Sequence, residues 1–255
     1  MSDPAVQSAT EVTPGLSQGQ RLINMFKAPT LTFKDVKAGH RSWWLPFIVT
    51  ALFGYVLWFS VGSQVTWKTV YDNQQKLAPE FAQRMMEQMP PEQRAAADAR
   101  GPKTQAITWA LSPIGLLLIN MIMALVLWPT INFAFGGKTN YGAVLAVIVY
   151  SGLLLWPVRF ILASVSLFAG EAPDSFNIGN PAPTNPAAFL NPSETSKALY
   201  ALLSAIDVPT ILCLAVCSIG IAIVAGTKRT SGYIAVFGWW TVVTLFFVGM
   251  AAIMG

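Results

Sequence analysis

Residues 115–127 read GLLLINMIMALVL, a stretch in which Asn120 is the one polar residue. Apolar and polar residues do not alternate here, as they would in a strand of a membrane β-barrel, and no polar face would suit a helix in water. The stretch lies inside a longer uncharged run, residues 106–135, which exceeds the roughly 20 residues that a helix needs to cross the apolar core of a bilayer. It therefore predicts a transmembrane helix.

The same composition recurs in four other parts of the chain. The apolar runs are residues 43–63, 106–135, 141–168, 198–226 and 233–254. Of 255 residues, 54% are hydrophobic and 11% are charged, whereas soluble domains carry about 25% charged residues. The charged residues lie almost entirely outside the five runs. Because lipid leaves backbone polar groups no partner outside their own segment, the sequence predicts an all-α polytopic membrane protein with five transmembrane helices.

The positions of these runs divide the chain into three parts. Residues 1–20 are polar and lack an apolar core, so we expect a disordered tail and no signal peptide. Residues 21–42 are expected to form short amphipathic helices at the cytoplasmic membrane surface, and residues 43–255 the five-span membrane domain. The residues expected to anchor the interfacial segment are Arg21, Phe26, Lys27, Lys34, Lys37 and Arg41.

The first loop is expected to be partly helical. Pro79 and Pro91 are each followed by Glu, which suits the start of a helix. By contrast, residues 169–192 contain five prolines and are expected to be irregular.

The distribution of basic residues predicts the orientation. Cations precede the first run, Lys138 lies between the second and third runs, and Lys228 and Arg229 lie between the fourth and fifth. Because cytoplasmic loops carry an excess of Lys and Arg, these segments are expected in the cytoplasm and the C-terminus outside.

A search for reactive or cofactor-binding groups yields no candidate. Phe135-Gly-Gly-Lys-Thr139 resembles the end of a phosphate-binding loop, but Asn132 stands where that motif needs glycine. Cys213 and Cys217 are expected to be small core residues, since no further metal ligand lies near them. We therefore expect no catalytic residue, no metal, no cofactor and no nucleic-acid partner.

Two ionisable residues inside the apolar runs are functional candidates. Arg159 lies nine residues from the outer end of the third run and Asp207 nine from the outer end of the fourth, so both are expected at a similar depth. One hypothesis is an intramembrane pair, which would offset the cost of burying either charge. Alternatively, Asp207 caps a helix at Val208-Pro209 and Arg159 extends to the headgroups. A third hypothesis is a role in transport.

Small residues recur along the fourth run. Ser218, Ala222 and Gly226 are spaced four apart and would share one helix face, which would allow close helix packing. A chance occurrence in an Ala-rich helix is the alternative.

Several motifs occur in an order that resembles the Yip family of Ypt/Rab-interacting membrane proteins, in its bacterial branch. The motifs are Phe26-Lys-Ala-Pro29 with Phe33, Gly136-Gly-Lys138 with Tyr141, Tyr150 and Pro157, Leu202-Leu-Ser-Ala-Ile-Asp207 with Gly220 and Gly226, and Thr230-Ser-Gly-Tyr233. The resemblance implies five spans, a cytoplasmic N-terminus and no enzymatic activity. It places the chain in a bacterial cytoplasmic (inner) membrane. Binding of a small GTPase follows by family analogy alone, because the acidic N-terminal motif of eukaryotic members is absent.

These observations favour a membrane scaffold or adaptor. Its expected partners are the lipid bilayer and other membrane proteins or further copies of the chain. The alternative is a subunit of a small-solute transporter or channel that uses Arg159 and Asp207. An enzyme ranks third.

Overall fold

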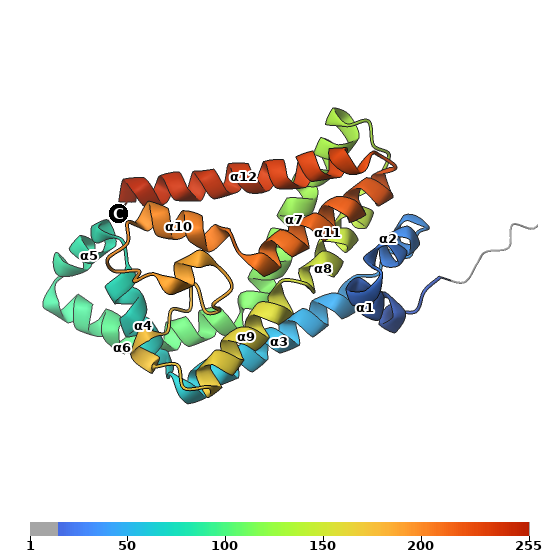
Figure 1. Cartoon of the computed structure of the whole chain (residues 1–255). Coiled ribbons are helices and arrows are strands. Elements are labelled where there is room, and N and C mark those ends of the chain that lie inside the picture. Colours follow the sequence, from blue (N-terminus) through green and yellow to red (C-terminus); the bar gives the residue numbers. More distant parts are fainter. Residues whose placement is uncertain (1–14, 255) are drawn as a thin grey trace, which may run out of the picture.

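The computed structural model describes residues 15–254, in which helices are joined by turns and no strand occurs (Figure 1). Five segments are long and apolar enough to cross a membrane. They are α3 (Trp44–Gln64), α7 (Ser112–Pro129) with the π-helix η1 (Thr130–Ala134), α8 (Tyr141–Gly152) with α9 (Trp156–Phe168), α11 (Val208–Ala225) and α12 (Arg229–Met254). The predicted all-α fold with five long apolar helical segments is confirmed.

A helical hairpin precedes the first span. It consists of α1 (Gln18–Lys27) and α2 (Pro29–Lys37). Ser17 and Gln20 form a capping box at the start of α1, and Pro29 opens α2 in the position where a helix tolerates proline. Of the predicted disordered tail, residues 1–14 lie outside the described residues, whereas residues 18–20 belong to the first turn of α1 because of this cap.

Short helices gather at the other end of the molecule (Figure 1). The first loop forms α4 (Trp67–Leu77), α5 (Glu80–Glu87) and α6 (Pro91–Ala110), so its predicted helical character is confirmed. α5 begins directly after Pro79 and α6 begins at Pro91. The proline-rich segment contains the 3₁₀ turns η2 (Pro173–Ser175) and η3 (Pro186–Phe189). The Asn73 amide donates to the carbonyls of Pro173 (2.9 Å) and Phe176 (3.1 Å), which fastens this segment to α4.

The predicted boundaries of two spans were wrong. Residues 106–110 end α6, and α7 begins only after Leu111, because Pro113 cannot donate the hydrogen bond that would continue α6 and instead occupies the first turn of a new helix. Most of the predicted start of the fourth span forms a separate helix, α10 (Lys197–Ala205). Asp207 caps α11, so this span begins at Val208.

The buried apolar side chains form two clusters. The first joins the hairpin to α7, α8, α11 and α12, around Phe33, Tyr150 and Ile221. The second joins α3, α4, α9 and the proline-rich segment, around Val61 and Phe176. The third span contributes to both, because α8 lies in the first cluster and α9 in the second.

Three segments that are distant in sequence meet at one end of the bundle. The hairpin packs on α8 and α11, and the loop between η1 and α8 lies against the end of α11, where the Lys138 N–H donates to the Ala225 carbonyl at 2.9 Å. The α11–α12 turn lies at the same end, and the C-terminal end of α12 lies at the opposite end (Figure 1). The segments that the basic residues assign to one side of the membrane are therefore neighbours.

Candidate functional site

A buried ion pair holds the hairpin together. The Arg21 Nε atom lies 2.9 Å from Asp35 Oδ2, and both side chains are more than nine-tenths buried. The Arg21 Nε–H donates its hydrogen bond to the Leu16 carbonyl at 3.2 Å and not to Asp35. The contact between Arg21 and Asp35 therefore joins α1 to α2 by charge attraction. The Leu16 N–H in turn donates to Asp35 Oδ1 at 3.0 Å.

The same arginine fastens the segment that leads into α3. One of its terminal nitrogens donates to the His40 carbonyl at 3.0 Å, and the Tyr150 hydroxyl of α8 donates to the Ser42 carbonyl at 3.0 Å. Residues 16–42, called the head from here on, are therefore tied internally by Arg21 and to the bundle by Tyr150. The expectation that Arg21 anchors the head at the lipid surface was wrong, because Asp35 provides an internal partner for its charge.

Phe33 fixes the head to the bundle. Its ring is fully buried and lies beside Gly220 of α11 and Val147 of α8. A Cβ atom on Gly220 would lie 2.6 Å from Val147 Cγ1 and 3.0 Å from the Phe33 ring, so only glycine leaves room for the ring.

The outer surface of the head combines apolar and basic side chains. Phe26 is 62% exposed and Ile23 55%, and Lys27, Lys34 and Arg41 are exposed as well. Of the predicted anchor residues, Phe26, Lys27, Lys34, Lys37 and Arg41 are therefore on the surface.

Lys37 has a further neighbour. Its Nζ lies close to Gly226, which ends α11 in a left-handed conformation (φ +69°). A cation next to the carboxyl end of a helix stabilises the helix dipole.

The glycine–lysine segment after η1 has a structural role in this fold. The Asn132 side chain accepts from the Thr139 N–H (3.1 Å) and donates to the Thr139 carbonyl (2.9 Å). Gly137 lies so close to the Ile131 carbonyl oxygen that a Cβ atom would lie only 2.8 Å from it. These contacts fold the segment against the end of α11.

Arg159 and Asp207 are not brought into contact. Among the ion pairs of residues 15–254, none includes either residue. Asp207 accepts hydrogen bonds from the Thr210 N–H (3.0 Å), the Thr210 hydroxyl (2.6 Å) and the Thr184 hydroxyl. Its carboxylate is thus occupied as a helix cap, which is the alternative that the Asp207-Val-Pro209 sequence offered.

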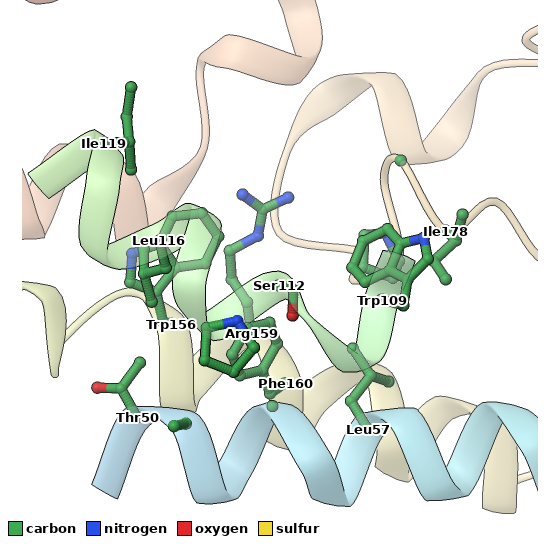
Figure 2. A pocket seen from close by; sticks show the side chains of 15 residues that line it. Thr50, Leu57, Trp109, Ser112, Leu116, Ile119, Trp156, Arg159, Phe160 and Ile178 are labelled. Atoms are coloured by element: carbon green, nitrogen blue, oxygen red, sulfur yellow. The ribbon is translucent and has the colours of Figure 1, made fainter. Parts of the chain in front are cut away.

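Arg159 extends into a cavity of about 370 Å³ between α3, α7, α9 and residues 178–181 (Figure 2). Apolar and aromatic side chains form most of its wall, and Arg159 is the one charged residue among those that line it. The sequence singled out Arg159 but gave no sign of the cavity, whose walls come from four separate parts of the chain.

The small-residue face of α11 packs within the chain. Ser218 and Ala222 are buried, and Gly232 of α12 lies so close that a Cβ atom on it would lie 2.1 Å from the Ser218 carbonyl oxygen and 3.1 Å from Ala222 Cβ. Gly226 does not continue this face but ends the helix.

Within residues 15–254, no three His, Cys, Asp or Glu side chains are placed so that they could hold a metal ion. Cys213 is half-buried and Cys217 is buried, and both are free thiols.

Comparison with known proteins gives one match. A family model described as Yip1 domain matches residues 23–252, nearly the whole chain. No curated protein and no solved structure matches. The match covers the head from residue 23 onward and the apolar spans up to residue 252, but it does not separate the branches of the family, so the bacterial assignment stays a prediction.

Proposed function

The chain belongs to the Yip1 family of membrane proteins, and from this premise we propose that it is a non-enzymatic membrane adaptor that docks an acidic segment of a partner protein on its head. The observation that carries the proposal is the construction of the head. A buried ion pair and the Phe33 ring fix its backbone, whereas Phe26, Ile23 and the exposed lysines face outward.

Charge complementarity favours an acidic partner. The basic residues at this end are Arg21, Lys27, Lys34, Lys37, Arg41, Lys138, Lys228 and Arg229. Asp35 is the one described acidic residue among them, and Arg21 neutralises it. The remaining cations form a positive surface, and such a surface steers an oppositely charged partner toward it.

The exposed apolar side chains supply the contact area that charge alone does not. Phe26 and Ile23 lie one helical turn apart on α1, next to Lys27. An aromatic side chain next to cations is a common composition for the centre of a binding surface. We propose that the acidic partner segment carries an apolar residue that packs against Phe26.

The experiment is co-purification in mild detergent with a photo-crosslinking residue in place of Phe26. We expect a crosslinked protein that is lost when Lys27 and Lys34 are changed to Glu. In the matched control, Lys76 and Lys103 at the opposite end are changed to Glu, and the crosslink should remain. Crosslinks to lipid alone would instead identify the head as a membrane anchor.

A separate measurement tests the alternative that the protein is a transporter subunit. Solute flux into proteoliposomes that carry the purified protein, lost in Arg159→Ala, would contradict the adaptor function. An adaptor gives the same flux as empty liposomes.

A further inference from the structure

A second site lies away from the head, around Arg159. Thr50 and Leu57 of α3 form the floor of the cavity, and Trp109 and Ile178 lie on the side opposite Trp156 and Leu116 (Figure 2). The Arg159 side chain rises from α9 between these two groups, beside Ser112 (Figure 2).

The charge of Arg159 has no counterpart in the described chain. No ion pair and no side-chain hydrogen bond of Arg159 occurs among residues 15–254, and Asp207, the partner that the sequence suggested, is occupied by Thr184 and Thr210. A guanidinium in apolar surroundings is costly unless an anion pairs with it. An anion that pairs with Arg159 would therefore come from outside this part of the chain.

The rim of the cavity indicates the source of that anion. Ile119 lines the cavity and is 48% exposed, and Leu52 and Leu118, which follow or precede the lining residues Ala51 and Ile119 in the sequence, are more than half exposed. These residues lie on the apolar spans α3 and α7, which pack on each other only over a short stretch. The cavity is therefore exposed at Ile119 on an apolar span, whose surroundings in a membrane would be lipid.

The chemistry of the wall specifies the ligand. A guanidinium binds phosphate through two parallel N–H···O bonds, and the Ser112 hydroxyl lies on the same cavity as a further hydrogen-bonding group. The apolar remainder of the wall suits an acyl chain. We propose that the cavity binds one anionic phospholipid, with its phosphate on Arg159 and an acyl chain against Leu116 and Ile119.

The test uses the full chain in mild detergent and native mass spectrometry. Dioleoyl phosphatidylglycerol, dioleoyl phosphatidylcholine and inorganic phosphate are the three probes. We expect one phosphatidylglycerol per chain to be retained, and at least about ten-fold weaker binding in Arg159→Gln, because a charge-assisted pair is lost. Arg94→Gln removes the same charge from an exposed position on α6 that does not line the cavity, and it should bind as the unmodified protein does.

A second variant leaves the charge in place. Ala51→Phe fills the cavity from the α3 side and should also weaken phosphatidylglycerol binding while Arg159 remains. Equal retention of phosphatidylcholine, binding of inorganic phosphate alone, or unchanged lipid binding in both Arg159→Gln and Ala51→Phe would each overturn the proposal. Size-exclusion elution and helical circular dichroism check that the variants are folded.

Discussion

Arg21 Nε lies 2.9 Å from Asp35 Oδ2 in the interior of the head, so one ion pair fixes α1 against α2. Removing a single partner of such a pair leaves an uncompensated buried charge, at a cost of about 3–5 kcal/mol. We therefore expect Asp35→Ala to lower the unfolding temperature in detergent by several degrees. Lys34→Ala, one position away and exposed, should leave it unchanged. The double variant Arg21→Met/Asp35→Leu should recover part of the loss, because it removes both charges but also the hydrogen bonds of Arg21 to the Leu16 and His40 carbonyls, and a double variant as unstable as Asp35→Ala would contradict this account.

Gly220 leaves the space that the Phe33 ring fills. Gly220→Ala places a methyl group 2.6 Å from Val147 and 3.0 Å from the ring, and overpacking of this kind costs about 1–3 kcal/mol. We expect a lower unfolding temperature and faster tryptic cleavage after Lys27 and Lys34, because the head is loosened. Gly238→Ala is the control, since nothing lies within 4 Å of its new methyl group. Equal cleavage rates in the two variants would show that Phe33 does not hold the head.

Asp207 and Arg159 are expected to act independently. Asp207→Ala removes the cap of α11, which costs about 0.5–2 kcal/mol. Because no ion pair joins Asp207 to Arg159, the loss of unfolding temperature in the double variant Arg159→Ala/Asp207→Ala should equal the sum of the losses in the single variants. A double variant that loses clearly less than this sum would re-establish the intramembrane pair.

The placement of the basic end on the cytoplasmic side can be tested by labelling. Single cysteines replace Lys27, Lys138 or Lys228 at one end, or Glu92 or Glu194 at the other, in a chain whose Cys213 and Cys217 are changed to Ala. A membrane-impermeant maleimide should label the Glu92 and Glu194 positions in intact cells and the three lysine positions only after permeabilisation. The reverse pattern would invert the predicted orientation.

The five spans are predictable because composition and run length are local properties of the sequence. The boundary at Asp207 was missed although an aspartate followed by Val208-Pro209 is a helix-start signal, because the apolar residues before it continue the run without interruption. The burial of Arg21 was missed for another reason. Its partner Asp35 lies on the next helix, and only the turn at Ala28 and Pro29 brings the two side chains together.

The site around Arg159 was predictable only as a single unusual charge. Nothing local links Thr50, Trp109 and Ile178 to it, since these residues become neighbours only when α3, α6, α9 and the proline-rich segment have packed. Likewise, the small-residue stripe signalled close packing but not that Gly232 of the same chain would be the partner.

The turn at residues 153–155 divides the third span into a part that belongs to the head's cluster and a part that carries Arg159. A helix advances by about 100° per residue, so one residue inserted at this articulation would rotate α9 about its axis relative to α8. The Arg159 side chain would then point away from its cavity, while the hydrogen bond from the Tyr150 hydroxyl to the Ser42 carbonyl would remain. The packing of the head on α8 and the position of Arg159 on α9 can therefore change independently in evolution, because only residues 153–155 connect the two helices.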